Sequence, residues 1–474
     1  MGATQSVAAS KTVTVIGGGV AGMSAACALA EAGLRVHLVE RRGYLGGRAS
    51  SYLHPGIGEV IDNCQHVLFG CCTNLVSFYS RIGAAEKIRW TSEMTMIEPG
   101  GRRSKLGPSS FMPAPLHSLP RLLAAHAFTL ADKLALARAF SAILKLDPKI
   151  PSTESLASWL TRNRQTQGAI NRFWKLVIAS ALNAEIECIA LPYAAKVIRE
   201  LFMNSAFAGQ MGINTVPLTE LYAGAQPFLA DRGSSIHLNS NVQSVEWDEE
   251  TSHWIVNARG EPLSAQFLVL ALPFEATARL LPHMPPADAA DALAQQIERH
   301  EHWPISSVHL WFDREITELD HAVLLDREIH WLFNRGQVQS WRNVKGSYIE
   351  LEVSASRSFA ALDRKEAIAL ALRELAEFFP AAASAKLVKA ALVKEVRATF
   401  GVPPGIDAAR PPSQSPWPNC FLAGDWTATR WPSTMESAAR SGHIAAEAIC
   451  ATLSDPRKFL APDLKPRGLM RFIG

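Results

Sequence analysis

The chain has 474 residues, of which 48% are hydrophobic and 19% charged, and its formal net charge is +3. Its length exceeds the roughly 250–300 residues that one hydrophobic core serves, which predicts two domains. The nearly balanced charge gives no indication of a nucleic-acid partner. The seven cysteines form no C-x-x-C pair and match no zinc spacing, which indicates reduced thiols, a cytoplasmic-side protein and no metal site.

We expect neither a secretory signal nor a membrane-spanning helix. Residues 1–10 lack the apolar stretch of a signal peptide and are expected to form a disordered leader. No apolar run elsewhere reaches the roughly 18 residues that a spanning helix needs.

Residues 13–40 carry the strongest local pattern. A β-branched run, Val-Thr-Val-Ile, predicts a buried parallel strand, and Gly17, Gly19 and Gly22 then form G-x-G-x-x-G at the turn into a helix rich in alanine. Glu40 ends the second strand, where a carboxylate binds a ribose hydroxyl. The combination predicts a dinucleotide site with the pyrophosphate at the helix N-terminus. The alternative is a tight turn in an ordinary α/β domain.

The next segment is a loop in which paired glycines lie beside arginines. Such a composition suits a loop packed against phosphates, and the alternative is a solvated loop. Its candidate cofactor contacts are Arg42, Gly46, Gly47 and Arg48.

Residues 110–230 are predicted to be mainly helical. Thr129 and Asp132 form a capping-box pattern, and an apolar stripe at helical spacing follows them. Aromatic residues of this region, such as Phe173 and Phe202, are expected to face an apolar volume. Four tryptophans are candidates to line a channel, although core packing explains them equally well: Trp159, Trp174, Trp303 and Trp311.

Strands return after residue 234, and a strand–helix unit ends the chain. The alternation predicts an α/β fold: a Rossmann-like domain assembled from discontinuous segments, and an α+β substrate domain with a mixed sheet and helices. We place the dinucleotide-binding domain at 11–100, 225–300 and 410–455, the substrate domain at 101–224 and 301–409, and a tail at 456–474.

A second glycine–acid motif begins the final unit. A short apolar strand reaches Gly424 and Asp425, and a helix is predicted to start near Ser433. An acid after a glycine can bind the pyrophosphate or ribityl region of a flavin dinucleotide. The helix start can direct N–H groups toward the flavin edge where reduction places negative charge.

Together these segments resemble the FAD-dependent amine oxidase and phytoene desaturase superfamily from about residue 11 to 453. The resemblance implies FAD as cofactor, with contacts from the residues already named and from Val242, Thr434 and Met435. The segment from Ile61 to Cys71 resembles the squalene-associated branch. Two positions depart from that branch: Cys64, where glycine is more frequent, and Arg430, where a small residue is usual.

The branch implies an apolar C30 isoprenoid substrate: an allylic hydroxyl of hydroxysqualene is replaced by hydrogen, with hydride from reduced FAD. The chain shows no nicotinamide motif, so an external electron donor is expected. Candidates for the proton donor are His66 and Asp62, because histidine titrates near neutral pH and their segment is expected beside the flavin. The alternative is that both only form structural hydrogen bonds.

Three other functions are weighed. A carotenoid-type desaturase would use the same flavin contacts. An amine oxidase is disfavoured, because the strand at 304–312 has no lysine and Thr434 stands where such enzymes place an aromatic residue. A non-catalytic prenyl carrier would not need the flavin contacts.

The tail combines basic and apolar residues between 456 and 474. This composition suits a peripheral contact with the inner membrane face. The alternative is a tail docked on its own domain.

Overall fold

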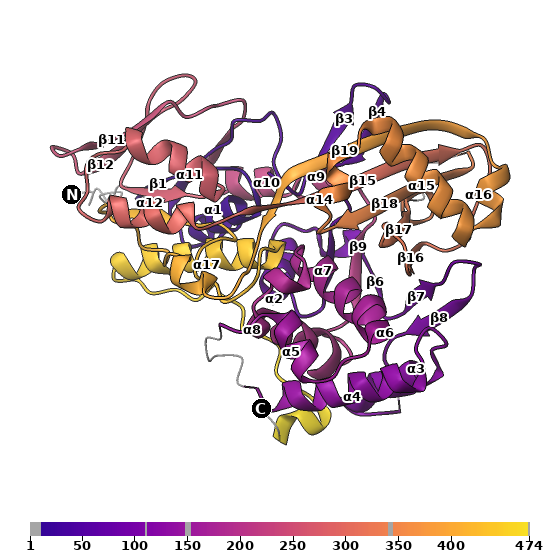
Figure 1. Ribbon diagram of the computed structural model, residues 1–474. Coiled ribbons are helices and arrows are strands. Elements are labelled where there is room, and N and C mark those ends of the chain that lie inside the picture. Colours follow the sequence, from indigo (N-terminus) through magenta and orange to yellow (C-terminus); the bar gives the residue numbers. More distant parts are fainter. Residues whose placement is uncertain (1–10, 110, 147–152, 340–344, 473–474) are drawn as a thin grey trace.

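The computed structural model describes residues 11–109, 111–146, 153–339 and 345–472. The expected leader at 1–10 lies outside the described residues. A five-stranded parallel sheet unites three distant parts of the chain (Figure 1). Its strands, in sheet order, are β10 (Ser235–His237), β2 (Arg35–Val39), β1 (Thr12–Ile16), β14 (Phe267–Leu270) and β20 (Cys420–Leu422). The Rossmann-like sheet of discontinuous segments is confirmed, whereas the residue-level domain boundaries stay predictions.

This sheet is buried on both faces, which explains its apolar strands. Alternate residues of β14 belong to two cores: Val269 packs with helix residues such as Ala25, and Leu270 packs with Trp254. One face carries α1 (Val20–Glu31), α10 (Ala225–Ala230) and α17 (Met435–Thr452). The other carries an antiparallel sheet of β11 (Ser244–Asp248), β12 (His253–Asn257) and β13 (Leu263–Ala265).

Helices α1 and α17 pack unusually closely. A Cβ added to Gly442 of α17 would lie 2.3 Å from the carbonyl oxygen of Ala21. The small residues of both helices therefore allow the C-terminal segment to join the N-terminal unit.

A seven-stranded mixed sheet forms the second part of the molecule, at the upper right of Figure 1. Its order is β19 (Leu387–Phe400), β15 (His302–Phe312), β18 (Ser347–Ser354), β17 (Trp331–Asn334), β16 (His321–Leu324), β7 (Met94–Ile97) and β8 (Arg103–Leu106). Its outer face is apolar and packs under α14 (Arg357–Ala361), α15 (Arg364–Phe378) and α16 (Pro380–Ser384).

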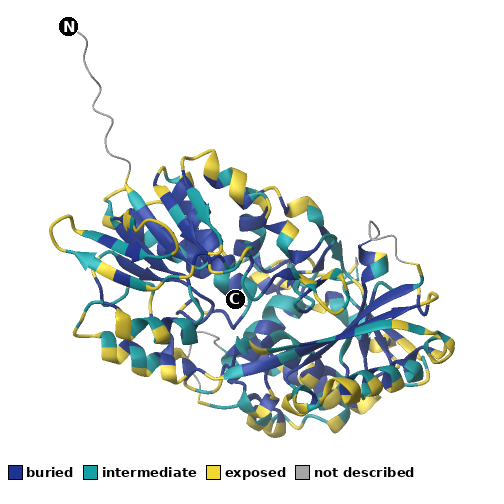
Figure 2. Cartoon of the chain, turned by 90° about the horizontal axis from the view of Figure 1, so that it is seen from above, coloured by how far each residue is buried: buried dark blue, intermediate teal, exposed yellow. Residues whose placement is uncertain are grey.

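A helical lobe lies against the other side of this sheet (Figure 1). The capping box of Thr129 and Asp132 is present at the start of α4. Figure 2 shows buried strands inside both parts and exposed residues on the surrounding helices and loops. The helices are α3 (Leu119–Ala124), α4 (Leu130–Leu144), α5 (Leu156–Arg162), α6 (Gln167–Ala169), α7 (Leu176–Leu182) and α8 (Leu191–Ile198).

Short strands connect the two parts. A hairpin of β3 (Ser51–His54) and β4 (Glu59–Asp62) leads into a sheet with the order β5 (Val67–Phe69), β9 (Met211–Asn214) and β6 (Ile88–Thr91). Helix α2 (Thr73–Arg81) follows β5.

The tail docks on the body of the protein. The backbone N–H of Leu469 donates to Ala114 (2.8 Å), that of Arg467 donates to Asn204 (2.8 Å), and Met470 is buried. The described part of the tail is therefore docked: Ala461 contacts the predicted dinucleotide-binding domain through Asn74, whereas the last residues contact the predicted substrate domain. Its contact with a membrane stays a prediction.

Candidate active site

The glycines of the first turn have distinct roles. Gly17 has φ +111°, and a Cβ there would lie 2.4 Å from the Ala271 carbonyl oxygen. A Cβ on Gly22 would lie 1.8 Å from the carbonyl oxygen of Gly17. Gly19 has open space in front of it, with the Gly47 Cα 3.9 Å from its added Cβ. Gly17 and Gly22 therefore permit close packing, and Gly19 leaves room for a phosphate at the start of α1.

Glu40 organises the neighbouring loop. Its Oε2 accepts the Gly18 N–H (2.7 Å) and its Oε1 accepts the Arg42 N–H (2.8 Å). Each carboxylate oxygen retains a lone pair, so a ribose hydroxyl can still donate to Glu40. The Arg42 guanidinium donates to the carbonyl oxygen of Gly47 (2.9 Å), which holds the loop beside the glycine turn.

The second loop crosses to the third segment of the sheet. Gly46 has φ +117°, and its N–H donates to Gly18 (2.9 Å). The guanidinium of Arg48 then forms an ion pair with Asp425, the acid that follows β20. Burial alone would raise the pKa of Asp425, but Arg48 and a hydrogen bond from Ser433 (2.5 Å) hold that pKa below its usual value. Asp425 is therefore a fixed anion.

The start of α17 is formed as the sequence predicted. Thr434 is the N-cap and its hydroxyl accepts the Ser437 N–H (3.1 Å), with Met435 as the first helical residue. The buried Arg410, which the sequence analysis missed, donates to the backbone oxygens of Thr427 and Asp425. A single arginine thus shapes the loop before the helix, and no local sequence pattern marks it.

Val242 lies in the loop after β10, two residues before β11 begins at Ser244. The same loop is joined to the site, because the Ser240 N–H donates to Glu40 (2.9 Å) and the Asn239 N–H donates to Arg42 (2.9 Å). The predicted cofactor contacts therefore meet along the carboxyl edge of the parallel sheet, where such sheets bind ligands.

An internal cavity of about 190 Å³ lies between the helical lobe and the seven-stranded sheet. Its wall is mainly apolar, and its residues come from both parts. Phe173 and Phe202 line it, as predicted, whereas the four candidate tryptophans are core residues outside its lining. Other apolar residues of the wall are Phe140, Met211, Trp331 and Phe333.

A buried polar cluster lies behind the inner end of this cavity. Arg335 forms ion pairs with Asp62 and with Glu350, whose Oε2 lies 3.4 Å from the Arg335 Nε. Glu352, which lines the cavity, accepts the Gln65 N–H at 2.6 Å. The three carboxylates and Arg335 are each at most 5% exposed.

Comparison with known proteins identifies the chain at this point. The family model for flavin containing amine oxidoreductases matches residues 20–450. The chain belongs to the flavin containing amine oxidoreductase family.

Individual relatives fall into two groups. The 15-cis-phytoene desaturase of Synechococcus elongatus is 24% identical over 465 residues, covering 93% of this chain and 96% of that protein. The zeta-carotene desaturase of Synechocystis is 25% identical over 478 residues, covering 93% and 97%. In fold, the chain resembles putrescine oxidase (TM-score 0.70, 17% identity, 93% and 99% covered) and the cyclohexylamine oxidase of Brevibacterium oxydans (0.65, 20%, 94% and 100%).

The protein is thus an FAD-dependent oxidoreductase. The geometry fits the cofactor: the open face at Gly19, the free lone pairs of Glu40 and the N-terminus of α17 surround one edge of the sheet. Residue-by-residue contacts with FAD stay predictions. No described helix is long and apolar enough to cross a membrane.

The two candidate acids of this flavin enzyme are placed differently from expectation. Burial would raise the pKa of Asp62, but Arg335, Ser51 and other donors hold it below its usual value. Asp62 is therefore an ionised structural acceptor and unsuited to donate a proton. Burial lowers the pKa of His66, and its Nδ1 pairs with the Cys64 carbonyl (2.8 Å). A catalytic role for His66 stays a prediction, and neither residue lines the cavity.

Glu350 and Glu352 were missed by the sequence analysis. Their alternation with Ile349, Leu351 and Val353 has the pattern of a half-exposed strand. In the structure every residue of β18 is buried, so the face that carries the glutamates is internal. Burial raises the pKa of Glu350 to about 7, and burial with the Glu350 charge raises the pKa of Glu352 well above its usual value. The available signal was a pair of glutamates on one face of a strand that carries no lysine.

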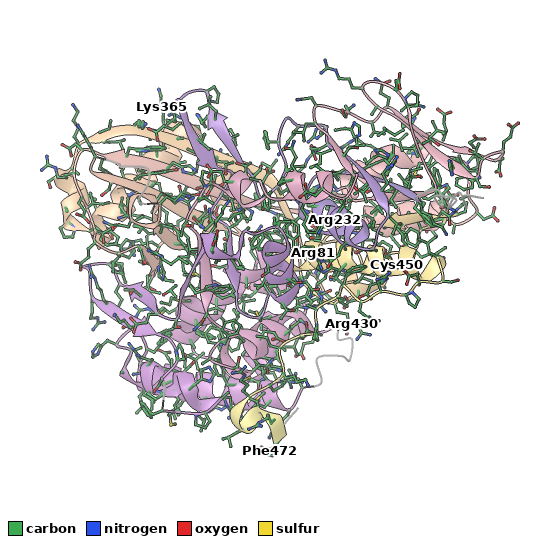
Figure 3. The ribbon with its side chains drawn as sticks, turned by 180° about the vertical axis from the view of Figure 1, so that it is seen from behind. Arg81, Arg232, Lys365, Arg430, Cys450 and Phe472 are labelled. Carbon is green, nitrogen blue, oxygen red and sulfur yellow. The ribbon has the colours of Figure 1, made fainter. Side chains whose placement is uncertain are left out.

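The cysteines are free thiols, and Cys71 and Cys72 are buried, which agrees with packing rather than redox chemistry. Cys64 is buried beside β15 and β18. Arg430, the other departure from the branch pattern, has φ +61° and an exposed side chain (Figure 3).

Proposed function

We propose that this flavin enzyme acts on a long apolar isoprenoid, and that its reaction is the reductive dehydroxylation of hydroxysqualene to squalene. The observation that carries the proposal is the cavity, whose mainly apolar wall also includes Gln65 and Glu352 of the sheet side. Bulky apolar walls suit a hydrocarbon chain, and the few polar groups among them suit one functional group on it.

The inner end of the passage adjoins the predicted flavin site. Gln65 lines the cavity, and two positions before it the Asn63 side chain donates to the Arg48 carbonyl (3.0 Å). Reduced FAD supplies a hydride when bound. The residues of this chain orient the substrate, exclude water by their apolar side chains and hold a proton near the polar end.

Amine oxidation fits this site less well. The strand β15 has no lysine, and Thr434 is the N-cap of α17 where an aromatic residue would form one wall of an amine cage. A cation would also have to leave water for a predominantly aromatic and aliphatic passage.

A second candidate is a carotenoid-type desaturase, in which electrons pass from the hydrocarbon to FAD. It is favoured by the names of the relatives, which are phytoene and zeta-carotene desaturases at 24–25% identity. Both candidates share the passage and the cofactor, and they differ in the direction of electron flow. Either requires an external partner to exchange electrons with FAD.

We also propose that the rim of the cavity contacts a lipid bilayer. Pro108, Ser118 and Leu122 line the cavity and are partly exposed. Around them the helical lobe and the tail expose a group of apolar residues, which we call the apolar rim: Phe111, Leu116, Leu123, Leu130, Leu134, Leu469 and Phe472.

Position and charge support a membrane partner for the apolar rim. Phe472 lies at the outer end of the tail, below the helical lobe in Figure 3, and is 83% exposed. The basic residues Arg121, Lys133 and Arg471 lie on the same segments, which suits anionic headgroups. A substrate dissolved in the bilayer could then enter the passage without crossing water.

An anaerobic experiment tests the reaction. The bound flavin is reduced chemically, hydroxysqualene is added, and the flavin spectrum and the product mass are followed. Reoxidation of the flavin with formation of squalene is expected. Reduction of the oxidised enzyme by phytoene, with no reaction of the reduced enzyme, would instead identify a desaturase.

A further inference from the structure

The buried polar cluster behind the cavity holds more carboxylates than cations. Asp62 of β4 and Glu350 of β18 pair with Arg335 of α13 (Arg335–Val338), and Glu352 lies two residues beyond Glu350 on the same face of β18. All four are at most 5% exposed, so water does not solvate their charges. Three buried anions beside one guanidinium would carry an uncompensated charge of high energy, so at least one carboxyl group takes up a proton.

The contacts indicate which carboxyl group is neutral. Arg335 contacts Asp62 and Glu350 directly, and Asp62 also accepts hydrogen bonds from Ser51 (2.6 Å) and Asn214 (3.2 Å). Glu352 accepts the backbone N–H of Gln65 and lies two residues from Glu350 on the same face of β18. The carboxyl group with the least cationic support is therefore Glu352. Burial and the Glu350 charge also keep its pKa far above the usual value.

Other titratable groups face the same space. His309 of β15 lies between Ser307 and Tyr348, with its Nδ1 2.9 Å from the Tyr348 hydroxyl and its Nε2 3.9 Å from Glu350. On the flavin side, Glu395 of β19 accepts the Asn63 side chain (3.1 Å). Of the three carboxyl groups in this cluster, Glu352 belongs to the cavity lining.

We propose that Glu352 is the catalytic proton donor of this enzyme, and that its carboxylic acid protonates the hydroxyl group of an allylic alcohol held at the inner end of the cavity. The assignment rests on the proposed reductive dehydroxylation. Glu350 is a positioning residue, because its charge keeps Glu352 neutral although Glu350 itself does not line the cavity. Arg335 and Asp62 act one step further away, since Arg335 pairs with both Glu350 and Asp62 and leaves Glu352 without a cation.

The step balances in atoms and charge. The Glu352 proton goes to the hydroxyl oxygen, the carbon–oxygen bond breaks with its electron pair on oxygen, and water leaves. The allylic carbon receives a hydride ion, which carries two electrons and one proton. The reduced flavin is the reductant that supplies it. The Glu352 carboxylate regains its proton from water before the next turnover.

The test compares Glu352→Gln with Glu374→Gln. Glu374 of α15 is also a buried glutamate with a raised pKa and backbone N–H donors, but it lies under the opposite face of the sheet. Each protein is loaded with FAD, reduced anaerobically and given either hydroxysqualene or the analogue with chloride in place of the hydroxyl. Chloride leaves as an anion without a proton.

We expect E352Q to lose about 10²-fold or more in single-turnover rate with the alcohol, as is usual for loss of a general acid. With the chloride its rate stays within a few fold of wild type, and E374Q matches wild type with both substrates. As a readout independent of turnover, infrared difference spectra of the FAD-free proteins at pH 7.5 should show a neutral carboxyl band that E352Q lacks.

Other results overturn the assignment in distinguishable ways. Full activity of E352Q with the alcohol, or equal loss with both substrates at full FAD content, removes Glu352 as the acid while the proposed function stands. A wild-type protein that converts neither substrate removes the proposed function, and the role of Glu352 with it. A neutral carboxyl band of equal size in wild type and E352Q shows that Glu352 is ionised and cannot donate a proton.

Discussion

Arg48 and Asp425 form an ion pair between residues that are 377 positions apart in the sequence. The arginine comes from the loop after β2, and the aspartate follows β20 in the last segment of the parallel sheet. This pair joins the first and last parts of the predicted FAD site, so cofactor binding and the closure of the domain depend on the same contact.

Removing one charge of this pair should therefore affect both. In D425N the Arg48 guanidinium loses its anion, and we expect the free energy of unfolding to fall by about 2 kcal/mol. This is less than the roughly 3–5 kcal/mol typical of fully buried pairs, because Arg48 is partly exposed. The FAD content after purification should fall with it. Urea unfolding and flavin absorbance measure the two effects. The exposed pair of Asp455 and Arg457 provides the control, since D455N should change neither.

The second prediction concerns pH. A carboxyl group whose pKa is raised by folding stabilises the protein fully below its unfolded pKa, and this contribution is lost as the pH rises toward the folded value. For Glu352 the loss begins near the ordinary glutamate pKa value of 4.5. We expect E352Q to gain stability over wild type by up to about 1.4 kcal/mol per pH unit above that point.

Urea unfolding of both proteins between pH 5 and 8 measures this difference. The comparison cancels the histidines, several of which have lowered pKa values and favour the opposite slope. Parallel pH profiles of the two proteins would contradict a neutral Glu352.

Arg335 is expected to be essential for stability. In R335M, Asp62 and Glu350 lose their shared cation inside the protein. The free energy of unfolding should therefore fall by about 3–5 kcal/mol. Adding D62N removes one of the stranded charges and should recover part of the loss. Urea midpoints of the single and double variants measure the coupling. Arg314, an exposed partner of Asp313, serves as the control position, and R314M should unfold like wild type.

Arg430 occupies a backbone conformation that favours glycine. Its φ is +61° and its side chain is exposed, so no packing contact is lost on truncation. We expect R430G to be more stable by up to about 1 kcal/mol, because glycine adopts this conformation without steric cost. R430A should show no such gain, since alanine keeps the Cβ. A gain in both variants would point to charge rather than backbone strain.

The apolar rim predicts binding to vesicles. In F472E combined with L130E, two exposed apolar residues become charged, and we expect about tenfold or greater loss of co-sedimentation with vesicles that contain anionic lipid. Activity in detergent should remain. L53E is the matched control, because Leu53 is 65% exposed but lies in the β3–β4 hairpin at the other end of the molecule (Figure 1). Equal binding of all three proteins would exclude the apolar rim as the contact.

Local patterns in the sequence were sufficient for the cofactor half of the protein. The glycines at 17, 19 and 22, the acid at Glu40 and the cap at Thr434 act through backbone geometry within a few residues of themselves. Such signals survive without knowledge of the fold, because the turn, the strand end and the helix start each impose their own residue types.

The reaction end of the site depended on tertiary contacts. Asp62 and His66 were selected because their segment was expected beside the flavin. In the structure Arg335 keeps Asp62 ionised, and the Cys64 carbonyl oxygen pairs with the His66 ring. Glu352 looks like an exposed-face residue in sequence, and only the packing of distant segments, among them Gln65 and α13, against β18 makes that face internal. The resemblance to the family, the cofactor-binding fold and a predicted set of contact residues follow from the sequence alone, since these are local requirements. Which carboxyl group is neutral was decided by the tertiary structure, because burial and the number of neighbouring charges exist only after distant segments meet.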